Sequence, residues 1–183
     1  MKKTILVLTG SPRKGGNSSM LADAFTQGAQ AAGHDVLRFD AGITLVNGCR
    51  GCDACWSKGE PCVFDDGFST LVPMLEAADA LVFATPLYWF GFSAQLKSAI
   101  DKFNAYTKER CPRPLKIREC FLMACAADDE PGLFDALVAN YRHIASYMNW
   151  RSRGVLTVPG VSDKGDITST NALAKAEAFG KSF

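Results

Sequence analysis

The most distinctive polar segment of the chain is GSPRKGGNSS, residues 10–19, which directly follows KKTILVLT with its apolar run TILVL. Its candidate anion donors are the side chains of Ser11, Arg13, Asn17, Ser18 and Ser19. Glycines let the backbone approach a ligand closely, and the free N–H groups at the start of a helix attract negative charge. Such a segment after a buried strand indicates a phosphate site. The alternative is a glycine-rich turn that binds nothing.

The same segment lacks two common nucleotide-binding motifs. A Walker A loop, GxxxxGK[ST], requires Lys and a hydroxyl residue after its second glycine, whereas Gly16 and Asn17 follow Gly15 here. The dinucleotide motif GxGxxG is missing because Pro12 stands where its second glycine belongs. We therefore expect neither nucleotide hydrolysis nor this mode of dinucleotide binding.

A second candidate segment, TPLYWFGF at residues 85–92, follows another apolar run and is rich in aromatic side chains. Aromatic residues in a loop at the ligand edge of a sheet indicate stacking on a flat ring. Two alternatives stay open, namely a loop that packs on itself and a contact between subunits.

Four of the seven cysteines form the pattern C-x2-C-x2-C-x6-C, at Cys49, Cys52, Cys55 and Cys62. Closely spaced thiolates of this kind are candidate ligands of a [4Fe–4S] cluster or of tetrahedral zinc. Cys52 and Cys55 alone form a C-x-x-C pair that is typical of a redox disulfide. Four reduced thiols are the remaining interpretation, and the spacing does not choose among these.

Apolar runs of strand length alternate with segments of helical period, which predicts a parallel sheet with helices between its strands. The predicted strands are residues 4–8, 34–39, 80–84, 120–126 and 155–158. The predicted helices are residues 17–33, 67–77, 93–107, 133–148 and 171–182. This alternation favours an α/β three-layer sandwich, and the flavodoxin-like strand order 2-1-3-4-5 is one of its two common arrangements.

Composition limits the classes of partner. The formal net charge of +1 gives no electrostatic basis for binding nucleic acid or an anionic membrane surface. No apolar run reaches the ~18 residues that a spanning helix needs, and the start does not resemble a signal peptide. We expect a cytoplasmic protein of one domain, residues 1–183, with a cysteine-containing loop at about 41–66.

Three segments together resemble the NADPH-dependent FMN reductase group of the flavodoxin-like superfamily, with iron–sulfur flavoproteins among the nearest relatives. They are GSPRKGGNSSMLADAF, CDAC followed by PCVFDDGF, and ATPLYWFGFSAQLKSAIDKF. Their order and spacing carry the resemblance, which covers about the first 110 residues.

The resemblance implies which residues hold FMN. The phosphate would be bound by Ser11, Arg13, Asn17, Ser18 and Ser19. The isoalloxazine ring would be enclosed by Pro86, Leu87, Tyr88, Trp89, Phe90 and Gly91. No catalytic side chain is expected, because the chemistry takes place on the flavin.

The activity implied is an NAD(P)H oxidoreductase that passes electrons to a quinone, a flavin or another small acceptor. The alternative is an electron-transfer iron–sulfur flavoprotein with FMN and a [4Fe–4S] cluster on Cys49, Cys52, Cys55 and Cys62. The resemblance also implies a homodimer or homotetramer. The sequence does not distinguish NADH from NADPH, nor does it identify the electron acceptor.

Overall fold

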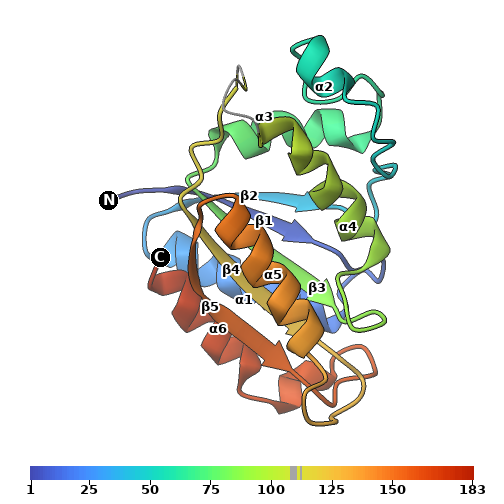
Figure 1. The fold of residues 1–183 in the computed structure, drawn as a ribbon. Coiled ribbons are helices and arrows are strands. Elements are labelled where there is room, and N and C mark those ends of the chain that lie inside the picture. Colours follow the sequence, from blue (N-terminus) through green and yellow to red (C-terminus); the bar gives the residue numbers. More distant parts are fainter. Residues whose placement is uncertain (108–110, 112) are drawn as a thin grey trace.

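The computed structural model describes residues 1–107, 111 and 113–183. These residues contain a five-stranded sheet made of β1 (Thr4–Thr9), β2 (Asp35–Asp40), β3 (Ala80–Pro86), β4 (Glu119–Cys125) and β5 (Arg151–Val158). All neighbouring strands are parallel, in the order β2-β1-β3-β4-β5 (Figure 1). The flavodoxin-like strand order is therefore confirmed.

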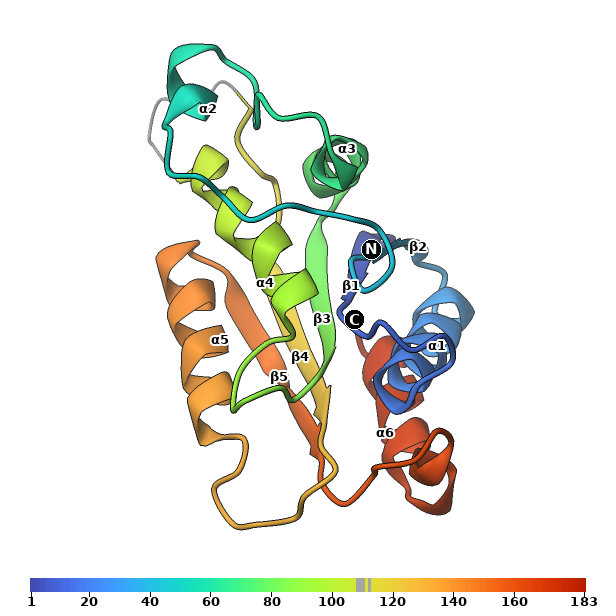
Figure 2. The same cartoon turned by 90° about the vertical axis from the view of Figure 1, so that its right-hand side faces the viewer.

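Helices cover both faces of the sheet, as the alternating pattern predicted (Figure 2). One face carries α1 (Asn17–Ala31) and α6 (Ala172–Lys181), and the other carries α3 (Gly67–Ala77), α4 (Ala94–Asp101) and α5 (Asp135–Tyr147). Glycines allow α1 and α6 to pack closely, because a Cβ atom on Gly28 would lie 2.0 Å from the carbonyl oxygen of Glu177. The three-layer sandwich is confirmed.

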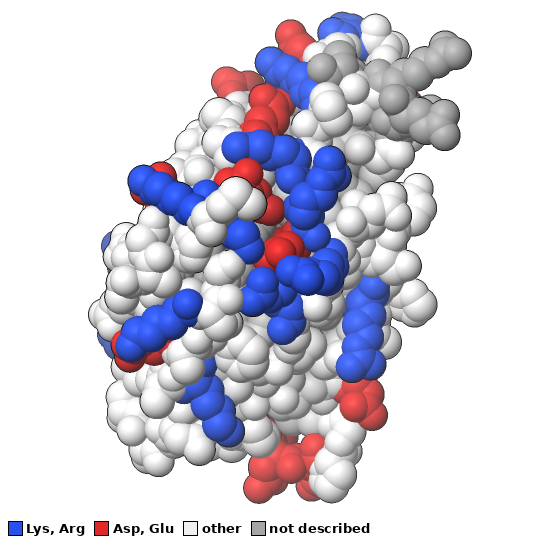
Figure 3. Space-filling view, turned by 90° about the vertical axis from the view of Figure 1, so that its left-hand side faces the viewer, with Lys and Arg blue, Asp and Glu red and all other residues white. Residues whose placement is uncertain are grey.

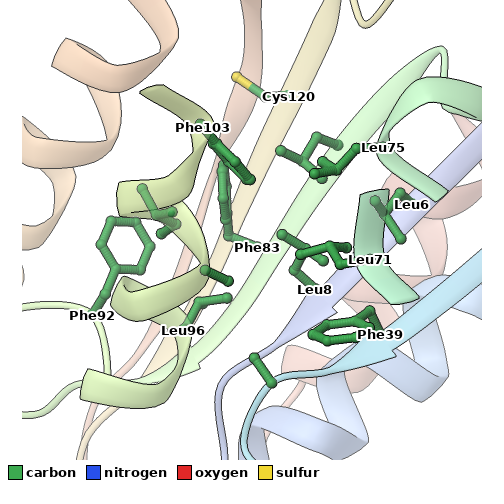
Figure 4. Close-up of a cluster of buried hydrophobic side chains, with 14 of the residues drawn as sticks. Leu6, Leu8, Phe39, Leu71, Leu75, Phe83, Phe92, Leu96, Phe103 and Cys120 are labelled. Atoms are coloured by element: carbon green, nitrogen blue, oxygen red, sulfur yellow. The ribbon is translucent and has the colours of Figure 1, made fainter. Parts of the chain in front are cut away.

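The sheet separates two hydrophobic clusters because successive strand side chains point to opposite faces. In β1, Leu6 and Leu8 face α3 and α4, whereas Ile5 and Val7 face α1. Figure 4 shows the first cluster, in which Leu71 and Leu75 of α3 lie over β1. The rings of Phe83 and Phe92 are neighbours in this cluster, with centroids 5.6 Å apart. β1, β3 and β4 are apolar along most of their length because they are covered on both faces.

Several element boundaries differ from the predicted ones. The helix predicted over residues 93–107 ends as an α-helix at Asp101 and continues as a 3₁₀-helix, η1 (Lys102–Tyr106). β5 begins at Arg151 rather than residue 155, because this edge strand keeps its polar first residues in solvent and in ion pairs with Glu119. Two short helices were not predicted, α2 (Ala54–Ser57) in the cysteine loop and η2 (Asp166–Ser169) after β5.

The carboxyl ends of β1 and β3 are held together by direct contacts between the loops that follow them. The Ser93 hydroxyl caps α4 and donates to the carbonyl oxygen of Gly10 at 2.7 Å. A Cβ atom on Gly10 would lie 2.5 Å from that hydroxyl oxygen and 2.9 Å from the Cβ atom of Leu96. Gly10 is thus needed for close packing, and the phosphate-loop candidate is fixed relative to the aromatic segment.

Across the described residues, none of the helices combines the length and the apolar character that crossing a membrane requires.

Candidate functional site

A cleft of about 600 Å³ lies at the carboxyl ends of β1, β3 and β4. Its lining comes from four loops that are distant in sequence, and consists of Ser11, Arg13, Gly16, Asn17, Ser18, Pro86, Leu87, Tyr88, Cys125, Ala126, Ala127, Val161, Ser162 and Lys164. The structure thus brings both predicted segments to one cleft. Ser19 is buried in α1 and does not line it.

The start of α1 offers unused donors to this cleft. Ser18 is 1% exposed, and its hydroxyl has no hydrogen-bond partner of ordinary geometry among the described residues. Gly16 stands at the N-cap of α1, where no side chain caps the first-turn N–H groups. A buried hydroxyl without a partner costs free energy unless a ligand accepts its hydrogen bond. With Arg13 beside it, this arrangement fits a phosphate group.

The side chain of Asn17 has a different role from the one that the sequence suggested. Its Nδ2 donates to the carbonyl oxygens of Val161 at 3.2 Å and Asp163 at 2.8 Å. Its Oδ1 accepts from the N–H groups of Gly165 at 3.0 Å and Ile167 at 3.5 Å. The amide is therefore fully occupied in holding the loop after β5 against α1. If Asn17 contacts a phosphate, the donor is therefore the main-chain N–H of Asn17 and not its side chain.

That loop contributes residues which the sequence analysis missed, including the cation Lys164. A Cβ atom on Gly15, whose φ is +62°, would lie 3.3 Å from Lys164 Nζ, so this ammonium group lies against the phosphate-loop candidate. Arg13 Nη1 donates to the carbonyl oxygen of Ser162 in the same loop, at 3.4 Å. Two cations thus lie at this end of the cleft, and Lys164 is separated from the first by about 150 residues of sequence.

Cys125, the last residue of β4, is a second missed residue of the cleft. Burial raises the pKa of its thiol to about 11, although contacts with the hydroxyl and N–H groups of Ser18 act in the opposite direction. The thiol is therefore protonated at neutral pH, and Cys125 contributes a small, uncharged wall. Nothing in its sequence context distinguishes it from an ordinary core residue of an apolar strand.

A second pocket, of about 900 Å³, continues from the cleft. Its lining is Leu87, Tyr88, Trp89, Phe90, Ala126, Ala127, Asp128 and Leu133, of which Leu87, Tyr88, Ala126 and Ala127 are shared with the cleft. Gly91 lines neither cavity but closes the aromatic turn. We call this second cavity the ring pocket, because its aromatic and aliphatic lining suits a flat ring system.

The aromatic turn is held in an unusual backbone conformation. Tyr88 and Gly91 pair through two hydrogen bonds, from Tyr88 N–H to the Gly91 oxygen at 3.2 Å and from Gly91 N–H to the Tyr88 oxygen at 3.0 Å. Between them, Trp89 and Phe90 have φ angles of 46° and 61°, which residues other than glycine rarely adopt. Trp89 is 96% exposed and Phe90 55% exposed. The turn therefore stores strain and presents two large aromatic side chains to solvent.

The four cysteines of the C-x2-C-x2-C-x6-C pattern line a third cavity, of about 420 Å³. The cysteine loop is fixed to η1 by Lys102, whose Nζ lies 2.7 Å from Asp66 Oδ2, and by Trp56, whose Nε1 donates to the Asn104 oxygen at 3.1 Å. In the described part of the chain, however, no three Cys, His, Asp or Glu side chains approach closely enough to hold a metal ion. All seven cysteines are free thiols.

The model of the NADPH-dependent FMN reductase family matches residues 3–154 of the chain. A Bacillus subtilis protein, YwqN, which is named as an NAD(P)H-dependent FMN-containing oxidoreductase, is 26% identical over 167 residues, covering 89% of this chain and 88% of that protein. An iron–sulfur flavoprotein of Archaeoglobus fulgidus is 36% identical over 99 residues. That match covers 54% of this chain but only 44% of the flavoprotein, so the two are alike over less than half of the longer protein.

Solved structures agree on the fold. An NAD(P)H:quinone oxidoreductase from Methanothermobacter marburgensis superimposes with a TM-score of 0.73 at 20% identity, covering 99% of this chain and 96% of that chain. An azoreductase from Bacillus anthracis gives a TM-score of 0.72 at 17% identity and covers 100% of both chains. The family match spans most of the sheet and both predicted binding segments. The chain belongs to the NADPH-dependent FMN reductase family.

Proposed function

We propose that the protein is an FMN-dependent oxidoreductase that takes electrons from NAD(P)H and passes them to a quinone, a flavin or another small acceptor. The observation that carries this proposal is the two-part cavity. One end has a buried, unpartnered Ser18 hydroxyl at a helix start beside two cations, and the other end is an aromatic pocket. A phosphate joined to a flat ring matches both ends at once.

The chain's own residues would bind and orient the flavin. Ser11, Ser18 and the first-turn N–H groups of α1, including those of Asn17 and Ser19, would donate to the phosphate, and Arg13 and Lys164 would balance its charge. Pro86, Leu87, Tyr88, Trp89 and Phe90 would enclose the ring and exclude water from part of it, and Gly91 would close the turn that carries them. Bound FMN would supply the redox chemistry, which is to take up hydride from NAD(P)H and to pass electrons to the acceptor.

Titration of the apoprotein with FMN, followed by steady-state oxidation of NADH and NADPH with a neutral quinone, tests the proposal. We expect saturable FMN binding and quinone-dependent oxidation of at least one nicotinamide. Ser18→Ala should raise the Kd for FMN about tenfold or more, because it removes a hydrogen bond to a charged group. Ser98→Ala on α4 is the matched control and should leave Kd unchanged, because this hydroxyl donates to the Ala94 oxygen of its own helix and lines neither the cleft nor the ring pocket. A protein that binds no FMN refutes the proposal.

We also propose a cytoplasmic location and self-association into a dimer or tetramer. Seven free thiols are compatible with a reducing compartment. The exposed Trp89 and Phe90 side chains are apolar surface that a second copy would cover. Sedimentation velocity of the purified protein tests the association, and a single monomeric species would contradict it.

A second candidate function is an electron-transfer flavoprotein that also carries a [4Fe–4S] cluster. Two observations favour it, namely that Cys49, Cys52, Cys55 and Cys62 line one cavity and that iron–sulfur flavoproteins are among the relatives. As arranged, the four thiols do not form a ligand set, so the loop would have to rearrange to hold a cluster. Iron and sulfide analysis of protein purified without oxygen distinguishes the two candidates, since a cluster requires about four of each per chain.

A further inference from the structure

The ring pocket has one charged residue among the eight described residues that line it. Asp128 lies three residues after the end of β4, and its main-chain oxygen accepts from the N–H of Gly160 at 3.0 Å, which fixes it at the pocket. The other lining residues are alanine, leucine or aromatic. Asp128 is exposed, so water and salt screen its charge, but no opposite charge among the lining residues cancels it.

Two further acids add to this charge next to Asp128 in the sequence, although neither lines the pocket. Asp129 and Glu130 are exposed and follow Asp128 in the same loop, which is held by a hydrogen bond from Leu133 N–H to the Glu130 oxygen at 3.2 Å. Among the described residues, no cation lies within 4.0 Å of any of these three carboxylates. In Figure 3, Asp and Glu side chains gather at the lower end of the molecule, where the loop after β4 lies in Figure 1. We call these three residues the acidic rim.

The cations of the cavity lie at its other end. Arg13 and Lys164 line the phosphate end and do not line the ring pocket. A bound phosphate would carry about two negative charges and would neutralise this pair. The acidic rim would therefore remain uncompensated when the flavin is in place.

We propose that the acidic rim selects the electron acceptor by charge, so that neutral and cationic acceptors react faster than anionic ones. The proposal rests on the proposed function, because the ring pocket is where an acceptor would meet the flavin ring. A quinone acceptor takes up two electrons and two protons from reduced FMN and leaves as the hydroquinone, which returns FMN to its oxidised form. The rim changes the local concentration of the acceptor and leaves this chemistry unaltered.

The size of the effect follows from Coulomb's law. For an assumed separation of about 8 Å in water, three unit charges change the local concentration of an acceptor about tenfold at low salt. At physiological ionic strength the Debye length is also about 8 Å, so the same charges change it only about threefold. Charge selection should therefore be steep at low salt and weak at high salt.

Stopped-flow measurement of the oxidative half-reaction isolates acceptor choice from NAD(P)H binding. The flavoenzyme is first reduced without oxygen by one equivalent of NADH or NADPH, and is then mixed with a neutral quinone, its sulfonated analogue or its quaternary-ammonium analogue. The test variant is D128N/D129N/E130Q. The control D35N/D101N/E177Q removes three surface acids that line neither the cleft nor the ring pocket.

We expect the parent and the control to favour the cationic over the neutral quinone, and the neutral over the sulfonated one, by about tenfold each at low salt. The rim variant should lose most of both preferences. Rate ratios that the rim variant leaves unchanged overturn the proposal. Failure of both nicotinamides to reduce the flavin would instead refute the proposed function, and the two failures are recorded in separate steps.

A second measurement needs no flavin. Trp89 lines the ring pocket and is 96% exposed, whereas Trp150 is buried. Trp56 is partly exposed, so Trp56→Phe is introduced into the parent and the rim variant alike, and external quenchers then report mainly on the rim region. In the parent apoprotein, caesium should quench tryptophan fluorescence more than expected from neutral acrylamide, and iodide less. In the rim variant, quenching by caesium and by iodide, each divided by quenching by acrylamide, should move toward the value expected for a neutral quencher. If these two ratios are the same in the parent and the variant, the charge argument itself is overturned.

Discussion

Replacing Asn17 with alanine tests whether one buried amide holds the loop after β5 against α1. The substitution removes four hydrogen bonds, to Val161 at 3.2 Å, Asp163 at 2.8 Å, Gly165 at 3.0 Å and Ile167 at 3.5 Å. At about 0.5–1.5 kcal/mol for each good bond, and less for the longest, the free energy of unfolding should fall by about 2–4 kcal/mol. Urea unfolding of the apoprotein, followed by circular dichroism, measures this loss.

Ser18→Ala in the neighbouring position is the matched comparison. Its hydroxyl has no regular partner among the described residues, so the apoprotein should keep its free energy of unfolding within about 1 kcal/mol while its affinity for FMN falls. Asn17→Ala should show the opposite balance, with a large stability loss in the absence of any ligand. If Asn17→Ala leaves the apoprotein as stable as the parent and weakens only FMN binding, Asn17 acts on the phosphate directly and the clamp assignment is wrong.

Two further substitutions test the loops around the site. Lys102→Met should lower the free energy of unfolding by about 3–5 kcal/mol in urea, because it leaves the carboxylate of Asp66 buried without its cation, both side chains being 3% exposed. Burial acts to raise the pKa of Asp66, but Lys102 and two N–H groups outweigh it and lower this pKa. Ionised Asp66 therefore stabilises the parent above about pH 4, and this stabilisation is lost as the pH falls through the lowered pKa. A free energy of unfolding of the parent that stays constant from pH 5 to pH 2 would contradict this. Replacing Trp89 and Phe90 by Asn and Gly should raise the melting temperature, because each positive φ costs about 1–3 kcal/mol for a residue other than glycine. The same replacement should weaken FMN binding. An unchanged or lower melting temperature would show that the turn is not strained.

The sheet and the main binding segments could be predicted because local signals specify them. The apolar runs of β1, β3 and β4 are read directly from the sequence, since strands covered on both faces are apolar throughout. The carboxyl ends of parallel strands must meet at one edge, so the segments after β1 and β3 were expected to share a site. Both segments do line the same cleft.

The rest of the site depends on contacts between distant segments, which no local pattern reveals. Lys164 reaches the cleft only because the chain crosses from β5 to α6 beside α1, and the Asn17 clamp fixes that crossing. The end of the helix at Asp101 was missed because η1 continues the same apolar pattern while its Lys102 turns inward to Asp66. The strained conformation of the aromatic turn was also beyond prediction, because Trp89 and Phe90 are not turn-forming residues.

The arrangement of the cavities makes the two candidate functions physically independent. The cavity of the four cysteines shares no described residue with the cleft or the ring pocket. It lies beside η1 at the far end of α4, whereas the aromatic turn lies at the start of that helix (Figure 2). The start of the cysteine loop does touch the phosphate end, where a Cβ atom on Gly42 would lie 1.9 Å from the main-chain oxygen of Ser11, but none of the four cysteines lines the cleft or the ring pocket. Loss of the four thiols should be judged by iron content, and loss of the Ser18 hydroxyl by FMN affinity, because neither result determines the other.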